Sequence, residues 1–190
     1  MSTKRVTTDA EAVLKEIEAL SQGRFLPIIG PVKGKYLAEN VKKYNVRKVL
    51  EIGTLIGYSA ILIASNLPPD GKVFTIEINS QSAKSAEKNI SKAGMADNIK
   101  IHLGNALIVI PEIEESFDMV FIDAAKDEYL DYLRLSEPKL KKNGIVFADN
   151  VKIFAAQMRD FLNYIRDSGK YDSHYIDVGF DGVEISQKLF

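Results

Sequence analysis

Apolar and polar positions along the chain follow two different periods. Between residues 8 and 20 the apolar positions lie three or four residues apart, at Ala10, Val13, Leu14, Ile17 and Leu20. This spacing predicts a helix with one apolar face, and Thr8 or Asp9 is available as its N-cap. The next segment, GRFLPIIGPVKG, contains two prolines and three glycines and predicts a loop, after which KYLAENVKKY regains helical spacing.

From residue 47 onward, short apolar runs alternate with segments of helical spacing. The predicted strands are RKVLEI, GKVFTIEI, NIKIHLG, FDMVFID and GIVFAD. Parallel strands need crossovers of this kind, and nearly continuous apolar strands imply a sheet that is covered on both faces. The pattern therefore predicts an α/β fold with a doubly wound, mostly parallel sheet.

The C-terminal segment breaks this alternation. KYDSHYIDVGFDGVEISQKLF offers two strand-like runs around GFDG with no helix between them, which predicts an antiparallel hairpin. The chain contains no repeat, low-complexity tract or linker, so we expect residues 1–190 to form a single domain.

Composition excludes several classes of function. With 25 basic and 26 acidic residues the net charge is −1, so the whole chain offers no attraction to nucleic acid or to an anionic membrane. The absence of cysteine excludes disulfides, cysteine-ligated metals and cysteine nucleophiles. No secretory signal and no run of roughly 20 apolar residues is present, which predicts a soluble, cytoplasmic protein.

A glycine-containing turn, VLEIGTLIGYSA, joins the first of these strands to its helix. Gly53 and Gly57 allow a sharp turn and the close approach of a ligand to the backbone. The motif is not G-x-G-x-x-G, because Leu55 and Ile56 stand where a dinucleotide needs an approachable backbone, and so a dinucleotide is disfavoured. Glu77 ends the second strand and is positioned to accept hydrogen bonds from the hydroxyls of a ribose. The alternative is two ordinary turn glycines and a solvated strand end.

Two further strands end in aspartate. If these strands are neighbours, Asp123, Asp149 and Asn150 meet at the carboxyl edge of the sheet. Oxygen ligands of this kind suit Mg²⁺ or another hard divalent ion better than zinc. Lys126 could then act as a general base, since a nearby cation lowers the pKa of a lysine. The alternatives are a helix cap at Asp123, a simple turn at ADN and a surface lysine.

Taken together, these motifs resemble those of the class I, S-adenosylmethionine-dependent and metal-dependent O-methyltransferases, the family of catechol and caffeoyl-CoA O-methyltransferases. The resemblance runs from about PIIGPVKG to the C-terminus and rests on VLEIGTLIGYSA, FTIEIN, GNAL, FIDAAKDEY and ADNV in that order. It implies S-adenosylmethionine as co-substrate, Mg²⁺ or a similar cation, and a Rossmann-like methyltransferase fold. We expect residues 1–46 to form an N-terminal helical extension and a loop that covers the cofactor.

The resemblance also assigns roles to single residues. Asp123, Asp149 and Asn150 match the metal ligands, and Lys126 matches the catalytic lysine. Contacts to the cofactor are implied for Ile29, Glu51, Gly53, Thr54, Gly57, Ser59, Glu77, Ala106 and Asp123. Within this set, Glu77 matches the ribose-binding acid, Ser59 the residue at the methionine carboxylate, and Ala106 the adenine contact.

Departures from the family pattern affect the acceptor. The hairpin YIDVGFDGVEI is shorter than that of the catechol enzyme and offers no clear match for its substrate-clasping acid, and the segments that recognise acyl-CoA are not identifiable. The favoured function is methylation of a catechol-like small molecule. The alternatives are methylation of a tRNA hydroxyuridine and, from another class, a nucleotide-binding module or an NAD-linked dehydrogenase. A homodimer is expected.

Overall fold

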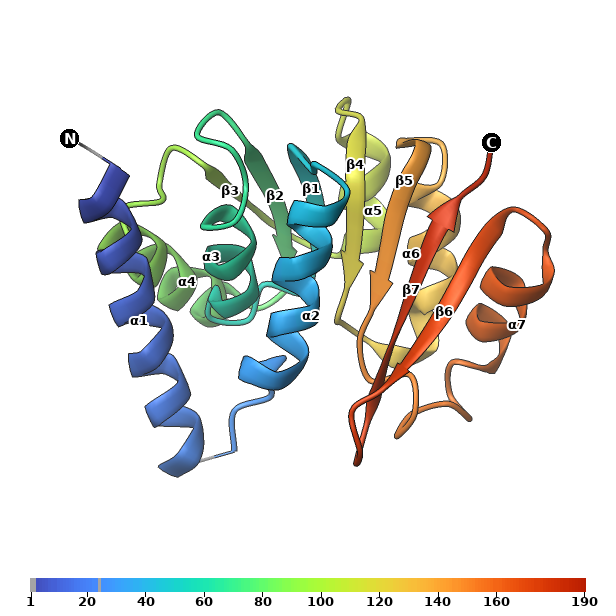
Figure 1. The fold of residues 1–190 in the computed structure, drawn as a ribbon, viewed down its shortest axis with the longest axis horizontal. Helices are drawn as coiled ribbons and strands as arrows, with labels where there is room; N and C mark the ends of the chain where they lie inside the picture. Colours follow the sequence, from blue (N-terminus) through green and yellow to red (C-terminus); the bar gives the residue numbers. More distant parts are fainter. Residues whose placement is uncertain (1–2, 24) are drawn as a thin grey trace.

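The computed structural model describes residues 3–23 and 25–190, with side chains from residue 9 onward. Its centre is a seven-stranded sheet in the order β3-β2-β1-β4-β5-β7-β6 (Figure 1). The strands are β1 (Lys48–Ile52), β2 (Lys72–Glu77), β3 (Ile99–Leu103), β4 (Phe117–Ile122), β5 (Leu140–Ala148), β6 (Tyr171–Asp177) and β7 (Gly182–Lys188). β1 to β5 are parallel, and β7 runs antiparallel to both β5 and β6. The predicted mostly parallel sheet with a C-terminal hairpin is confirmed.

Helices cover both faces of this sheet. They are α1 (Thr3–Gly23), α2 (Gly30–Lys43), α3 (Tyr58–Ala64), α4 (Ser80–Lys92), α5 (Ala106–Glu112), the 3₁₀ helix η1 (Lys126–Glu128), α6 (Tyr129–Ser136) and α7 (Arg159–Asp167). Helices α1 to α4 contribute to the hydrophobic core on one face, whereas α5, α6 and α7 contribute to the core on the other (Figure 1). The fold therefore has three layers.

The central strands supply apolar side chains to both cores. On one face Phe121 of β4 packs edge-to-face against Phe147 of β5, with ring centroids 5.7 Å apart. The neighbouring residues Val120 and Val146 belong to the core on the other face. Successive side chains of a strand point to opposite faces, so an apolar run without alternation is what a doubly covered sheet requires.

Two N-terminal boundaries differ from the sequence-based prediction. α1 begins at Thr3, so Thr8 and Asp9 lie inside the helix and neither is its cap. α2 begins at Gly30, inside the segment predicted as a loop. Pro31 is compatible with this start, because its φ is already helical and the first helical turn has no intrahelical partner for the missing N–H. The change places Lys33 in the first turn of a helix.

The strand order reverses at β1, which pairs with β2 on one side and with β4 on the other. In open α/β sheets, ligands bind outside the carboxyl ends of the strands at such a reversal. No helix among residues 3–23 and 25–190 is both long and apolar enough to cross a membrane.

Candidate active site

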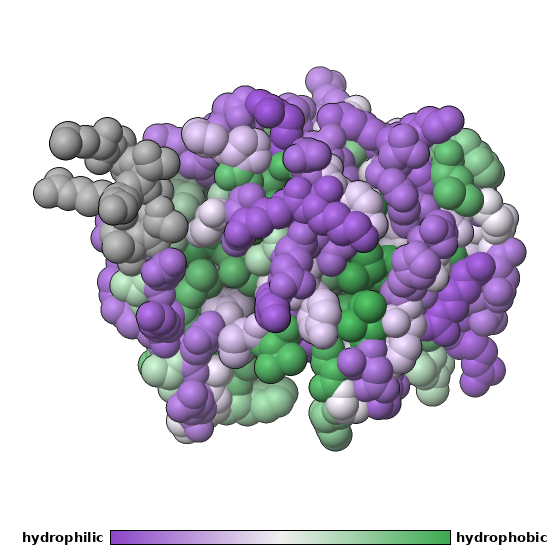
Figure 2. Space-filling view, viewed as in Figure 1, coloured by the Kyte–Doolittle hydropathy of each residue, from purple (hydrophilic) through white to green (hydrophobic). Residues whose placement is uncertain are grey.

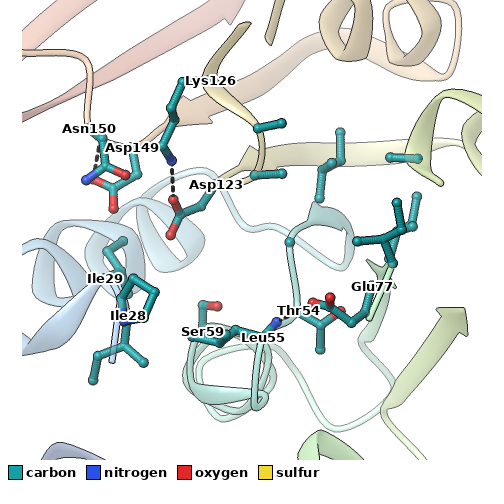
Figure 3. Close-up of a pocket in the computed structure, with 18 of the residues that line it drawn as sticks. Ile28, Ile29, Thr54, Leu55, Ser59, Glu77, Asp123, Lys126, Asp149 and Asn150 are labelled. Carbon is teal, nitrogen blue, oxygen red and sulfur yellow. Dashed lines mark hydrogen bonds and ion pairs between the residues drawn. The ribbon is translucent and has the colours of Figure 1, made fainter. Parts of the chain in front are cut away.

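A cavity of about 830 Å³ opens at the carboxyl ends of the parallel strands. Its walls come from the β1–α3 turn, the ends of β2, β4 and β5, and the segment that enters α2 (Figure 3). The predicted site residues that line it are Ile29, Gly53, Thr54, Ser59, Glu77, Ala106, Asp123, Lys126, Asp149 and Asn150. Glu51 and Gly57 do not line it.

One end of the cavity, the turn end (Gly53, Thr54, Ser59 and Glu77), is built on the β1–α3 turn. Gly53 has a φ of +104°, and a Cβ there would clash with the backbone carbonyl of Asp123. Only glycine permits this close approach of two strand ends. Gly57, at φ +87°, is the N-cap residue of α3, so it shapes the turn from outside the cavity wall.

Both carboxylate oxygens of Glu77 accept backbone hydrogen bonds, one of them from the β1–α3 turn. Its Oε2 accepts a hydrogen bond from the N–H of Leu55 at 2.7 Å, and its Oε1 accepts one from the N–H of Asn79 at 2.8 Å. Leu55 has a positive φ of 50°, which is uncommon for a residue with a side chain, and the bond to Glu77 stabilises it. Each carboxylate oxygen keeps acceptor capacity for a ligand hydroxyl.

Glu51 lies behind the cavity wall and is fully buried. Neither of its carboxylate oxygens has a hydrogen-bond partner among the residues that the structure describes. Burial raises the pKa of Glu51 to about 8, the nearby Ser59 and Thr75 hydroxyls oppose this, and the Asp123 and Glu77 carboxylates add to it. Burial disfavours the charged form, so the folded protein favours the protonated form of Glu51 up to a higher pH than the unfolded chain does.

The other end of the cavity, the acid end (Asp123, Lys126, Asp149 and Asn150), lies where β4 and β5 stop. Ile122 and Ala148 are partners across these strands, so the aspartates that follow them lie side by side. Burial and the neighbouring Asp123 carboxylate raise the pKa of Asp149 to about 7, although Lys33 opposes the shift. The predicted juxtaposition of the two strand ends is present.

Lys126 points into the acid end rather than into solvent (Figure 3). Its Nζ donates to Asp123 Oδ1 at 2.8 Å and to the Tyr129 hydroxyl at 2.9 Å. The buried Tyr129 hydroxyl donates in turn to the backbone carbonyl of Asp149 at 3.2 Å. The N-cap of the following 3₁₀ helix is Ala125, so Asp123 does not serve as the helix cap.

Sequence reasoning missed two charged residues beside the acid end. Lys33 Nζ lies 2.6 Å from Asp149 Oδ1 and 2.8 Å from Asp181 Oδ2. Asp181 Oδ2 also accepts a hydrogen bond of 2.7 Å from the Asn150 side-chain amide. Lys33 and Asp181 are 148 positions apart and stand in segments predicted as a loop and a hairpin turn, so no local pattern could have paired them.

The donor set of the acid end fits a hard divalent cation. No group of three or more His, Cys, Asp or Glu side chains suited to a metal occurs in the described part of the chain. The oxygens available at this end are those of the Asp123 and Asp149 carboxylates and of the Asn150 amide, and this oxygen-only set would leave positions for water or substrate. Each carboxylate already attracts a lysine ammonium group, which shows that the site favours positive charge.

Comparison with known proteins adds independent findings. A family model described as O-methyltransferase matches residues 4–160. A catechol O-methyltransferase from Mus musculus is 34% identical over 176 residues, which cover 88% of this chain and 66% of that protein. The chain thus spans about two thirds of the length of this relative.

Solved structures match over nearly the whole chain. The O-methyltransferase TomG from Streptomyces achromogenes, involved in tomaymycin synthesis and solved in complex with SAM, is 27% identical with a TM-score of 0.86 and 100% coverage of both chains. An O-methyltransferase from Bacillus cereus in complex with SAH is 28% identical with a TM-score of 0.83, covering 95% of this chain and 90% of that one.

Proposed function

The chain belongs to the O-methyltransferase family, and from this membership we propose that it transfers the methyl group of S-adenosylmethionine to a hydroxyl of a small, catechol-like acceptor with the help of a divalent cation. The observation that carries the proposal is that the turn end and the acid end belong to the same cavity. A nucleoside and a reacting hydroxyl can therefore be held next to each other, and such positioning lowers the barrier to reaction.

The turn end would bind the methyl donor. Glu77 would accept hydrogen bonds from the ribose hydroxyls, and Gly53 would let the backbone approach the ligand. Ser59 would contact the methionine carboxylate. Ala106 would lie against the adenine, and Ile29, at the N-cap of α2, would cover the cofactor. When bound, S-adenosylmethionine supplies a methyl group on a positively charged sulfur.

The acid end would bind the acceptor. Asp123, Asp149 and Asn150 would hold Mg²⁺ or Mn²⁺, and a cation there supplies positive charge that lowers the pKa of a nearby hydroxyl. Lys126 reaches the same end of the cavity through its bond to Asp123. Beside a bound cation its side chain would be held as the neutral amine, which is the form that can take the hydroxyl proton.

The rim of the cavity favours an aromatic acceptor. Phe25, Ile153 and Phe154 contribute apolar surface to the cavity, and Phe25 is 93% exposed. Figure 2 shows hydrophobic surface reaching the lower edge of the molecule near the tip of the β6–β7 hairpin. An aromatic ring can pack against the apolar residues of the cavity rim while its two adjacent hydroxyls face the acid end.

The expected homodimer and the tRNA alternative stay predictions.

An acceptor screen tests the proposed reaction. Purified protein with Mg²⁺ and methyl-labelled S-adenosylmethionine is incubated with catechols, flavonoids or tRNA that contains hydroxyuridine. We expect label in a catechol-type product, whereas label only in tRNA would support the alternative acceptor. Thermal shifts with S-adenosylhomocysteine and with NAD separate the reaction classes, because a ligand that binds the native state raises the melting temperature. A shift with NAD alone would contradict the proposal.

A further inference from the structure

Three segments that are distant in sequence meet behind the acid end. α2 contributes Lys33, the end of β5 contributes Asp149 and Asn150, and the turn between β6 and β7 contributes Asp181. The side chains of Lys33, Asp149 and Asp181 are only 13%, 2% and 8% exposed. Water screens charges poorly at such depth, so the electrostatic energy of the site depends strongly on the distances between these three side chains.

Asp181 determines how the Asn150 amide is oriented. An ionised carboxylate only accepts hydrogen bonds, and its Oδ2 lies 2.7 Å from Asn150 Nδ2. The NH₂ end of the amide must therefore face Asp181, which leaves the carbonyl oxygen Oδ1 as the end available to a cation. Without Asp181, the amide could rotate and present its NH₂ group to the site instead.

Lys33 has the opposite effect to Asp181, because it would lower the affinity of the same site for a cation. Its ammonium group is 2.6 Å from Asp149 Oδ1, an oxygen that also accepts the backbone N–H of Asn150 at 2.7 Å. A divalent cation on Asp149 would have to share this carboxylate with Lys33 or displace it. Asp181 lies 2.8 Å from Lys33 and can retain the ammonium group when it leaves Asp149.

We propose that Asp181 and Lys33 are positioning residues that tune cation affinity in opposite directions. Asp181 presents the Asn150 oxygen to the cation, and Lys33 competes with the cation for Asp149. This inference rests on the proposed function, because it assumes that the acid end binds a divalent cation. It adds two residues from outside the predicted ligand set, one on α2 and one in the hairpin turn.

The test measures the affinity of the protein for Mn²⁺, and electron paramagnetic resonance reports the concentration of the free ion. This measurement does not depend on activity. Asp181→Leu removes the acceptor, and we expect it to weaken Mn²⁺ binding about 10- to 100-fold, the usual cost of losing an outer partner of a metal ligand. Asp181→Asn keeps an amide oxygen that can accept the Asn150 N–H, and we expect it to recover most of the affinity. Lys33→Met removes competition and repulsion, and should tighten binding about tenfold.

Two variants serve as matched controls. Lys35→Met removes an exposed lysine of α2 that pairs with Glu39, and Asp172→Leu removes an exposed acid of β6 that lies beside His174. Both should leave Mn²⁺ affinity unchanged. S-adenosylhomocysteine binding reports whether each variant is folded, because neither Lys33 nor Asp181 is among the proposed cofactor contacts.

The outcomes separate this inference from the proposed function. If wild-type protein binds Mn²⁺ and both Asp181→Leu and Lys33→Met bind it equally well, the inference is overturned and the cation site stands. If wild-type protein takes up no Mn²⁺, both are overturned. Should Asp181→Leu lose S-adenosylhomocysteine binding, Lys33→Met alone decides, since unchanged or weaker Mn²⁺ binding in that variant contradicts competition.

Discussion

Lys126 and Asp123 are joined by a hydrogen bond of 2.8 Å between Nζ and Oδ1, within a cavity that also contains the proposed cofactor-binding turn. This geometry makes Lys126 the candidate base. We expect Lys126→Ala to lower kcat by roughly 10²–10⁴ while S-adenosylmethionine affinity stays near wild type. The loss should shrink as pH rises, because an acceptor hydroxyl that is already ionised needs no base.

A pH–rate profile with a catechol acceptor measures this effect. Lys141→Ala is the control, because Lys141 is an exposed lysine that pairs with Asp118 at 2.7 Å outside the cavity. A Lys126→Ala variant with a wild-type rate near neutral pH would remove Lys126 from the mechanism and leave the cation site untouched.

Glu77 is expected to bind the donor and to hold its turn. Glu77→Ala should weaken S-adenosylmethionine binding by about 1–3 kcal/mol, since charge-assisted bonds to the ribose hydroxyls are lost. It also removes the hydrogen bond that supports the positive φ of Leu55. Isothermal titration calorimetry measures the affinity, with Glu87→Ala on the exposed face of α4 as control. An unchanged affinity would argue against ribose recognition by Glu77.

Gly53 should tolerate no side chain. In Gly53→Ala the added Cβ would meet the Asp123 carbonyl at a φ of +104°, so we expect the free energy of unfolding to fall by more than about 1 kcal/mol. Binding of S-adenosylhomocysteine should weaken as well, because Asp123 must move. Gly23→Ala, which has open space around the new methyl group, is the matched control. Chemical denaturation that shows equal stability for the two variants would contradict the close approach.

Glu51 should make the ligand-free protein less stable as pH rises. Its pKa is about 8 in the folded protein against an ordinary value of 4.5, so the folded state holds a proton that the unfolded chain releases. The free energy of unfolding should therefore decrease between about pH 4.5 and pH 8. Glu51→Gln removes this titrating group, so the free energy of unfolding, measured by denaturation across that pH range, should change less steeply with pH. An identical slope in the variant would mean that Glu51 is ionised in the folded state.

The sequence was most informative about the sheet and its carboxyl edge. Apolar runs without alternation identified the buried parallel strands, and the acids after two of them predicted that Asp123 and Asp149 would meet. That inference needed only the rule that parallel strands end at a common edge, and the β4–β5 pairing bears it out. The position of Glu77 in the cavity follows from the same rule.

The features that were missed depend on contacts across the fold. The predicted caps Thr8 and Asp9 were wrong, because no proline or glycine in residues 3–7 stops the helix from starting earlier. Lys33 and Asp181 lie in segments without a motif, and only packing of α2 against the hairpin turn brings them to Asp149. A loop assignment cannot indicate which buried carboxylate a lysine will reach.

The proposed reaction is tested most directly by methyl transfer to catechol before and after removal of divalent cations, with the methylated product measured by mass spectrometry. We expect wild-type protein to lose the reaction after chelation with EDTA and to regain it with Mg²⁺ or Mn²⁺. Asp149→Asn should form little product even with added cation, because it loses one of the two carboxylates of the site. Full product formation by rigorously chelated wild-type protein would contradict the proposal that Asp123, Asp149 and Asn150 hold a cation needed for catalysis.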